Sequence, residues 1–262
     1  MSRTLSAGER VLLLDNKKRR YLVTLEEGGE FHTHSGFVPH DSIIGGHEGV
    51  TITATRGARY VVVRPTLGEF VLKMPRGAQV IYPKDLGPIL MLADIYPGVR
   101  VLESGVGSGA LSMTMLRAGA VITGYELRND FANRARKNVE SFLGAEALER
   151  FTVEERDCYD GIDGNGSDDT GFDRVVLDLP EPWQVVAHAE QALVPGGILI
   201  AYTPSITQAA QLRERLEKSS FAMESTVEVL HRGWHIEGQA VRPDHRMVGH
   251  TGFLTHARLV GL

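Results

Sequence analysis

The sequence predicts an α/β fold, a Rossmann-like domain on a mostly parallel sheet, preceded by a small all-β domain. Short apolar runs separated by loops such as Gly45-Gly46 fill the first 72 residues, which indicates a small antiparallel barrel or sandwich. After Asp85 the pattern changes to strands alternating with helices, which is typical of a parallel sheet with crossover helices. We therefore predict one domain at residues 1–72 and a second, including the linker, at residues 73–262.

The apolar pattern defines candidate strands and helices in each domain. In the first domain the candidate strands are residues 11–14, 21–25, 50–54, 60–63 and 70–72. In the second they are residues 100–103, 121–126, 151–157, 173–178 and 197–202, with helices beginning near Pro88, Ser108, Asn129, Glu181 and Ser205. Residues 225–231 and 252–259 leave no room for a crossover helix, so we expect them to close the sheet with antiparallel pairing.

Composition and charge limit the class of protein. The chain has 262 residues, a mean hydropathy of -0.11 and no apolar run near the roughly 18 residues that cross a bilayer, so we expect no membrane segment. The N-terminus lacks an apolar signal segment and Cys158 is a lone cysteine, which favours the cytoplasm. The net charge of -5 is unevenly spread: residues 1–84 carry 12 Lys and Arg against 8 Asp and Glu, whereas residues 85–227 carry 12 against 22. A mildly basic first domain favours contact with nucleic acid there.

A glycine-rich loop, Glu103-Ser104-Gly105-Val106-Gly107-Ser108-Gly109, lies directly between an apolar strand and a helix. Glycines there permit close approach of the backbone to a ligand, and the start of the helix offers unpaired N–H groups. Gly105, Gly107 and Ala110 also match the dinucleotide fingerprint G-x-G-x-x-A. The loop therefore predicts a site either for a nicotinamide dinucleotide or for S-adenosylmethionine.

Acidic residues follow three neighbouring strands at the edge where α/β sheets bind ligands. Glu103 is placed to attract the ammonium group of a methionine moiety, which a dinucleotide lacks. Glu126 can accept hydrogen bonds from both ribose hydroxyls, and Asp157 can accept one from the amine of an adenine ring. An NADP-dependent oxidoreductase would need an arginine for the ribose phosphate, so Glu126 opposes that alternative. The three acids favour S-adenosylmethionine as the cofactor.

The fourth strand of this pattern ends in Asp178-Leu179-Pro180-Glu181-Pro182-Trp183. Proline ends the strand and directs the preceding side chains toward the ligand edge of the sheet. Asp178 can accept a hydrogen bond from the exocyclic amine of a base while the adjacent ring nitrogen attacks a methyl group, and its charge stabilises the cation that forms. Asp178 is therefore the candidate catalytic residue.

Five segments carry a resemblance to a known family. They are FHTHSGFVPHDSIIG, QVIYPKD, ESGVGSGALS, DLPEPW and VRPDHRMVGHTGFLTHARL, and they extend over nearly the whole chain. In these segments the chain resembles the TrmI family of tRNA (adenine-58-N1)-methyltransferases, of the actinobacterial type. The resemblance implies a class I methyltransferase domain, in which a seven-stranded, mostly parallel sheet has one antiparallel closing strand.

The resemblance also implies the reaction, the partners and the site residues. It implies methyl transfer from S-adenosylmethionine to N1 of adenine 58 in the T-loop of tRNA, with S-adenosylhomocysteine as product and no metal. It implies a homotetramer that contacts tRNA partly through the first domain. The residues that it places at the cofactor are Gln79, Ser104, Gly105, Val106, Gly107, Ser108, Glu126, Asp157 and Asp178, and it places Tyr82 and Tyr202 beside the adenine.

Histidines and basic residues of the first domain allow other interpretations. His32, His34, His40 and His47 lack cysteine partners and a helical H-x-x-x-H spacing, so we expect structural or RNA-facing roles and no metal site. The cluster Lys17-Lys18-Arg19-Arg20 indicates a hairpin turn that either neutralises phosphates or is simply solvated. A non-catalytic RNA-binding protein with the same fold is the second alternative, and it differs from a methyltransferase in having no affinity for S-adenosylmethionine.

Overall fold

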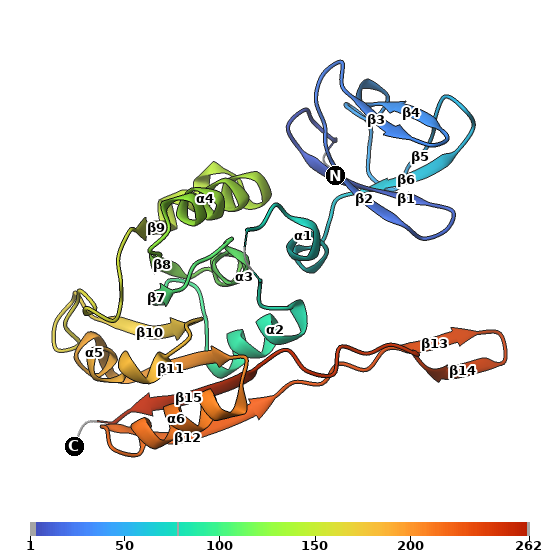
Figure 1. Cartoon of the computed structure of the whole chain (residues 1–262). Coiled ribbons are helices and arrows are strands. Elements are labelled where there is room, and N and C mark those ends of the chain that lie inside the picture. The colour runs from blue at the N-terminus through green and yellow to red at the C-terminus, as the bar shows by residue number, and fades with distance from the viewer. Residues whose placement is uncertain (1–3, 78, 261–262) are drawn as a thin grey trace. The chain divides into compact units, whose positions relative to one another are not determined.

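The computed structural model describes residues 4–77 and 79–260, and the chain forms two compact units, Met1–Met74 and Pro75–Leu262 (Figure 1). The division lies two residues after the boundary that the sequence predicts. Among the described residues no helix has both the length and the apolar composition needed to cross a bilayer.

The first unit contains two antiparallel sheets. Four strands pair in the order β2-β1-β6-β5, and they span Arg20–Thr24, Arg10–Asp15, Arg59–Val63 and Thr51–Thr53. A hairpin of β3 (Glu30–Thr33) and β4 (Gly36–Pro39) forms the second sheet, and the 3-10 turn His40–Ser42 follows it. Apolar side chains from both sheets meet in one core that includes Leu13, Leu25, Val38, Ile43 and Val62.

Residues 70–72 form part of a helix, so the strand predicted there is wrong. Helix α1 (Leu67–Lys73) begins after Thr66, whose hydroxyl accepts a hydrogen bond from the Glu69 N–H while the Glu69 carboxylate accepts one from the Thr66 N–H. This reciprocal capping box stabilises the first turn, and the helix buries Phe70 and Val71. Three consecutive apolar residues fit a buried strand or a helix equally well, and the cap decides between them.

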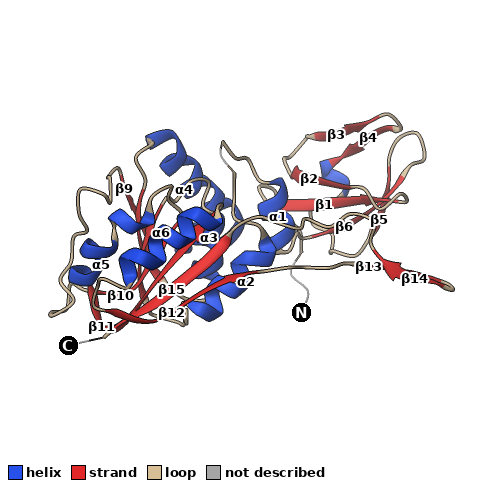
Figure 2. Cartoon of the chain, turned by 60° about the horizontal axis from the view of Figure 1, so that its bottom comes forward, coloured by secondary structure: helices blue, strands red, loops and turns tan. Residues whose placement is uncertain are grey.

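A seven-stranded sheet forms the centre of the second unit (Figure 2). Its order is β12-β15-β11-β10-β7-β8-β9, and the strands span Phe221–Glu228, Phe253–Leu259, Leu193–Thr203, Phe172–Leu177, Arg100–Ser104, Val121–Tyr125 and Phe151–Glu154. The five strands from β11 to β9 pair in parallel, whereas β15 pairs antiparallel with both β11 and β12. The predicted fold class is confirmed.

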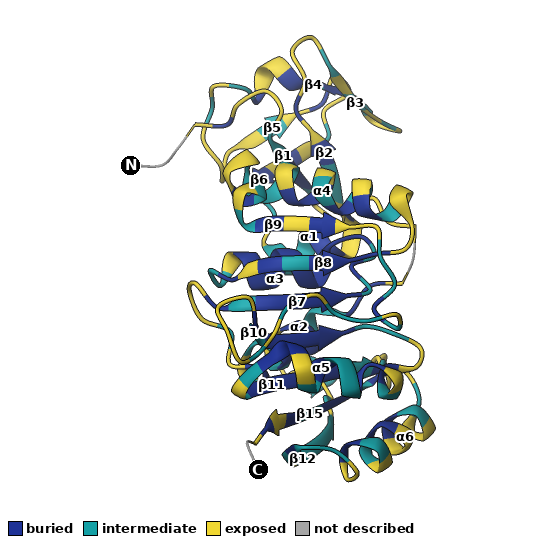
Figure 3. Cartoon of the chain, turned by 90° about the vertical axis from the view of Figure 1, so that its left-hand side faces the viewer, coloured by how far each residue is buried: buried dark blue, intermediate teal, exposed yellow. Residues whose placement is uncertain are grey.

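Helices flank this sheet and pack in two groups. Helices α2 (Pro83–Leu92), α3 (Ala110–Arg117) and α4 (Asn129–Leu143) pack against one another in chain order. Helix α5 (Val186–Ala192) packs on β11, and α6 (Ile206–Leu216) packs on β11, β12 and β15. The central strands β7 and β10 are buried along most of their length (Figure 3), as expected of strands covered on both faces.

Three local features of the second unit differ from the predicted pattern. Strand β9 ends at Glu154, so Asp157 lies in the loop beyond it rather than at the strand end. Helix α2 begins at Pro83 and not near Pro88, because a proline is favoured in the first turn of a helix, where its missing N–H costs nothing. The chain between β12 and β15 also forms a hairpin, β13 (Trp234–Glu237) and β14 (Ala240–Pro243), that the sequence pattern does not predict.

Candidate active site

Backbone hydrogen bonds join β7 to its two neighbours at the carboxyl edge of the sheet. The Asp178 N–H donates to the Ser104 carbonyl at 2.9 Å, and the Gly105 N–H donates to the Tyr125 carbonyl at 3.1 Å. The glycine loop therefore starts between the ends of β8 and β10. Ligands of open α/β sheets bind at this edge.

Two glycines let the loop pass close to other backbone. Gly105 has a φ of 85°, and a Cβ there would collide with the carbonyl oxygen of Asp178. Gly109 has a φ of 83° and caps helix α3, and a Cβ there would lie 3.2 Å from the Cα of Ala135 on α4. Both conformations favour glycine, which is why the loop can turn tightly and present the first N–H groups of α3 at the sheet edge.

The two side chains between these glycines, Val106 and Ser108, are buried. Val106 is 4% exposed, and its side chain fills the space beside Gly124 on β8, where a Cβ would lie 2.7 Å from Val106 Cγ2. Ser108 is also buried, and its carbonyl accepts a hydrogen bond from the Asn138 amide at 2.9 Å. The loop is therefore held in one shape by α4 and β8, so the site is preorganised for a ligand.

Glu126 connects this loop to the end of β8. One carboxylate oxygen accepts the Gly107 N–H at 2.9 Å and the other accepts the Arg128 N–H at 2.9 Å. A carboxylate offers about four lone-pair positions, so each oxygen keeps one for a further donor. Glu126 is thus oriented by the backbone and can still accept hydrogen bonds from two ribose hydroxyls, the role that the sequence predicts for it.

Glu103 is a buried carboxylate without a partner. It is 1% exposed, and neither oxygen has a hydrogen-bond partner among the described residues. Burial, together with the charges of Asp178 and Glu126, raises the pKa of Glu103 to about 8, although the nearby Ser112 acts to lower it. An unpaired buried charge is costly, so this position fits a ligand that brings its own cation, as the ammonium group of S-adenosylmethionine would.

We expect the free energy of unfolding of the ligand-free chain to fall as pH rises from about 4.5 to about 8. The folded state holds the Glu103 proton more tightly than the unfolded state, so across this window the unfolded state binds fewer protons and stability declines. One such group contributes a slope of at most about 1.4 kcal/mol per pH unit. Urea titrations at several pH values in this range measure the free energy of unfolding. Its decline per pH unit should be smaller for Glu103→Gln than for the wild type.

The pKa of Asp178 is also raised, to about 7, so Asp178 likewise lowers the free energy of unfolding as pH rises. Part of this pH-dependent decline in stability should therefore remain in the Glu103→Gln variant. Glu217→Gln is the matched control, because Glu217 lies exposed beyond α6. An unchanged slope in Glu103→Gln would show that the Glu103 proton is not held in the folded state.

Asp157 and Cys158 lie in the loop after β9. Asp157 accepts the Tyr159 N–H at 2.9 Å through Oδ1, which leaves Oδ2 for another donor. The Cys158 side chain is buried in the core behind the sheet edge, and burial raises the pKa of its thiol to about 11. Cys158 is therefore an unreactive core residue, whereas the predicted contact between Asp157 and the adenine of the cofactor stays a prediction.

A cavity of about 400 Å³ lies beside the end of β10. Its lining includes four of the predicted site residues, Gln79, Tyr82, Asp178 and Tyr202. Burial, together with the charge of Glu126, raises the pKa of Asp178 to about 7, and burial raises that of Tyr202 to about 12. The Tyr202 hydroxyl donates to the Thr251 carbonyl at 2.7 Å, so this ring has a fixed position in the cavity.

A buried polar network behind this cavity has no counterpart in the sequence predictions. Lys84 Nζ donates to Asp85 Oδ1 at 2.8 Å and to the Val229 carbonyl at 2.7 Å, and Thr251 Oγ1 donates to Asp85 Oδ2 at 2.6 Å. It ties the start of α2 to the segment before β15. Lys84 and Asp85 stand in QVIYPKD, but two adjacent charges at the start of a helix usually face solvent, so no local pattern predicts their burial.

His250 also lines the cavity. One ring nitrogen lies 2.6 Å from a Glu228 carboxylate oxygen and the other 2.8 Å from the Pro204 carbonyl, and the bond to Glu228 raises the pKa of His250. His250 and the nearby His245 both lie in the segment before β15.

Comparison with known proteins gives the family. Residues 59–242 match the family described as tRNA methyltransferase complex GCD14 subunit, and residues 4–52 match the family described as TrmI-like N-terminal. A tRNA (adenine(58)-N(1))-methyltransferase TrmI of Thermus thermophilus is 38% identical over 251 residues, which cover 95% of this chain and 96% of that protein. The chain belongs to the TrmI family of tRNA methyltransferases.

Solved structures of related proteins match nearly the full length of the chain. A SAM-dependent O-methyltransferase from Thermotoga maritima has a TM-score of 0.91 and 31% identity, covering 99% of this chain and 96% of its own. The tRNA (m1A58) methyltransferase TrmI from Aquifex aeolicus has a TM-score of 0.85 and 28% identity, covering 99% of this chain and 100% of its own. This membership does not favour the NADP-dependent oxidoreductase or the non-catalytic RNA-binding protein.

Proposed function

We propose that the chain transfers a methyl group from S-adenosylmethionine to N1 of adenine 58 in the T-loop of tRNA. The observation that carries this proposal is the position of Asp178. It follows directly on the strand that borders the glycine loop, and its side chain lines the cavity that also contains Tyr82 and Tyr202. A base in this cavity would lie next to a cofactor held by the loop.

The chain's own groups position the base and stabilise charge. When bound, S-adenosylmethionine supplies a methyl group on a positively charged sulfur. The N1 lone pair of adenine would form the new N–CH3 bond while the S–CH3 bond breaks. The electron pair of the S–CH3 bond would stay on sulfur. Adenine becomes a cation without a proton transfer in this step. The Asp178 carboxylate accepts a hydrogen bond from the N6 amine and stabilises the positive charge that forms.

The base must leave its stack before it can react, because N1 of an adenine inside folded tRNA is not accessible. Tyr82 and Tyr202 offer flat apolar surfaces on which an extruded base can stack. The Tyr202 hydroxyl stays protonated at neutral pH, since burial raises its pKa to about 12, and it keeps its hydrogen bond to the Thr251 carbonyl. These two rings would give the adenine a fixed orientation toward Asp178.

Mass spectrometry of tRNA incubated with the chain and S-adenosylmethionine tests the proposed function. We expect one methyl group on adenine 58, located by nuclease mapping, and its conversion to the N6-methyl isomer under alkali, which marks a methyl at N1. An unmethylated tRNA, or a methyl group on a ribose oxygen or another base, would refute the proposal. The same digest shows whether the adenine at position 57 also gains a methyl group.

We further propose that the chain works as a homotetramer in the cytoplasm. Support for assembly comes from the β13–β14 hairpin, which projects away from the seven-stranded sheet (Figure 1) and exposes Trp234, Ile236 and Val241. Apolar side chains gathered on a projecting element are typical of a protein interface. Light scattering of the purified chain would measure the mass of the assembly, and a monomer mass would contradict this part of the proposal.

A further inference from the structure

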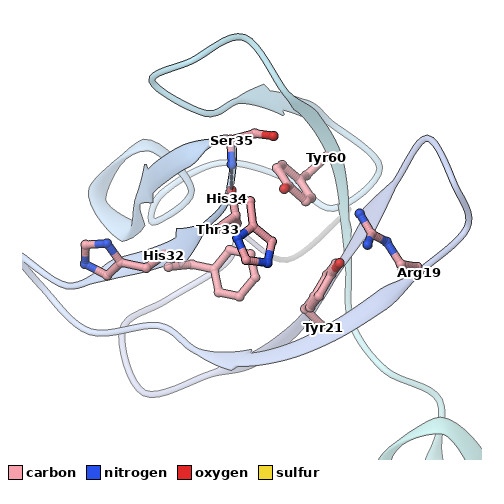
Figure 4. Close-up of a pocket in the computed structure, with 8 residues that line it drawn as sticks. Arg19, Tyr21, His32, Thr33, His34, Ser35 and Tyr60 are labelled. Carbon is pink, nitrogen blue, oxygen red and sulfur yellow. Dashed lines mark hydrogen bonds between the residues drawn. The ribbon is translucent and has the colours of Figure 1, made fainter.

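The first unit carries a hollow of about 370 Å³ at the turn between β1 and β2 (Figure 4). Its lining comes from that turn, from β2, β3 and β6, and from the β3–β4 turn, and it includes Arg19, Tyr21, Phe31, His34 and Tyr60. The proposed methyl transfer requires none of these residues. Their chemistry therefore calls for a separate explanation.

Three aromatic rings form one wall of the hollow. The ring centroids of Tyr21 and Phe31 are 5.3 Å apart, those of Phe31 and Tyr60 are 6.0 Å apart, and those of Tyr21 and Tyr60 are 6.3 Å apart. Tyr60 is 4% exposed and belongs to the core of the unit, so the wall is formed before any ligand binds. Rings that support one another in this way offer flat apolar surface at little cost in conformational entropy.

Arg19 places a positive charge at the rim of this wall. Asp15 accepts hydrogen bonds from the Arg19 N–H at 2.9 Å and from its Nε at 2.6 Å, which fixes both the backbone and the guanidinium. Nη1 and Nη2 have no hydrogen-bond partner among the described residues, and the side chain is 59% exposed. The neighbouring Arg20 is paired with Glu69 at 2.9 Å. Arg19 can therefore bind an anion without rearrangement.

The β3–β4 turn holds His34 at the opposite rim. Thr33 Oγ1 donates to the Gly36 carbonyl at 2.8 Å and accepts the Ser35 N–H at 3.0 Å, which fixes the turn. Figure 4 shows the His34 imidazole turned toward the hollow and the His32 imidazole turned away from it. The hollow thus has an aromatic wall, a guanidinium on one rim and an imidazole on the other.

We propose that this hollow binds one unstacked nucleobase of the tRNA, stacked on the aromatic wall, with an adjoining phosphate on Arg19. The proposal rests on tRNA being the substrate. Every base has a π face, so such a site accepts a base with little regard to sequence. The guanidinium fork matches two phosphate oxygens, and the adjacent exposed Lys17 and Lys18 add positive charge along the same turn.

The charges at the hollow argue against a cationic ligand. Aromatic walls also bind methylated ammonium groups, but Arg19 at the rim would repel them. The carboxylate of Asp15 offsets part of this repulsion through its ion pair with Arg19, but the exposed Lys17 and Lys18 keep the turn positive overall. An anionic, flat ligand is the class that the lining favours, and a nucleotide combines both properties.

Binding of an unmodified tRNA transcript to the full chain tests the proposal. We expect Tyr21→Leu and Arg19→Gln each to raise the Kd for tRNA about tenfold, His34→Ala to raise it less, and Tyr21→Phe to keep nearly the full affinity. Arg59→Gln is the matched control, since it removes the same charge from an exposed position of β6 outside the hollow. Affinity for S-adenosylmethionine, measured by calorimetry, should be the same in all variants.

The outcomes separate this proposal from the proposed function. Wild type that neither binds nor methylates tRNA would refute the proposed function. If the wild type binds and methylates tRNA, but Tyr21→Leu and Arg19→Gln bind tRNA as tightly as Arg59→Gln does, only the base-binding site is refuted. If Tyr21→Leu does not fold, Arg19→Gln and His34→Ala decide the question. Ultraviolet crosslinking of tRNA should also yield a nucleotide-bearing peptide that contains residues 31–35, and its loss in Tyr21→Leu or Arg19→Gln would agree with the site.

Discussion

Asp178→Asn is expected to lower kcat for tRNA methylation by at least about 100-fold while the chain stays folded. Asparagine keeps the size of the side chain and one acceptor oxygen, but it lacks the negative charge that stabilises the cation forming on adenine. Initial rates at saturating tRNA and S-adenosylmethionine measure the effect, and thermal unfolding shows that the variant is folded. Glu181→Gln is the matched control, because Glu181 lies three residues further along the same segment and is exposed.

The pH dependence of kcat/KM gives a second measure of the role of Asp178. Burial and the charge of Glu126 raise its pKa to about 7 in the ligand-free chain, and the charged form is the one that stabilises a cation. We therefore expect kcat/KM to rise as pH increases through about 7, and Asp178→Asn to reduce this rise, the remainder coming from Glu103, whose pKa is raised to about 8. An Asn variant with wild-type kcat and an unchanged pH profile would exclude Asp178 from the chemistry.

The second unit could be predicted from sequence because its sheet is covered on both faces. Strands β7 and β10 are short apolar runs followed by a glycine loop or by proline, and these signals place their ends within a residue. The β13–β14 hairpin gives no such signal, since Ile236 and Val241 are exposed and no alternating buried pattern develops. A strand can be predicted from sequence when its buried face requires apolar residues, and an exposed hairpin does not impose such a pattern.

The candidate site also contains residues that the local sequence pattern predicts and residues that it does not predict. The glycine loop, Glu126 and Asp178 depend on positions relative to strand ends, which the apolar pattern determines, and the structure brings them to one edge. The network of Lys84, Asp85 and Thr251 depends on a contact between residues 166 positions apart. No local pattern contains that contact. Recognising it requires the closed sheet, in which β15 returns beside β11.

Asp85→Ala is expected to lower the free energy of unfolding by about 3–5 kcal/mol. Its side chain is fully buried, and it accepts hydrogen bonds from Lys84 and from Thr251. Its loss leaves the Lys84 ammonium, 7% exposed, with the Val229 carbonyl as its one remaining partner among the residues that the structure describes. Denaturant unfolding monitored by circular dichroism measures the change.

Two control variants test why the loss of Asp85 should destabilise the chain. The first tests whether burial of the ion pair matters, and the second tests whether the unpaired charge matters. Glu214→Ala breaks an ion pair with Lys218 that has the same 2.8 Å separation, but both side chains are about two-thirds exposed, and stability should hardly change. The double variant Lys84→Met/Asp85→Leu removes both charges and should be more stable than Asp85→Ala, because no charge is left unpaired. Equal destabilisation in the double variant would show that packing at this position, and not charge, is responsible.

The same variants test how the network reaches the cavity. Thr251 links Asp85 to Tyr202, since its hydroxyl donates to the carboxylate and its carbonyl accepts from the tyrosine. The double variant keeps the helix and the sheet but loses the acceptor for the Thr251 hydroxyl. If the network positions Tyr202 for the extruded adenine, the double variant should have a raised KM for tRNA and an unchanged Kd for S-adenosylmethionine. A wild-type KM in a stable double variant would limit the network to holding the segment before β15 in place.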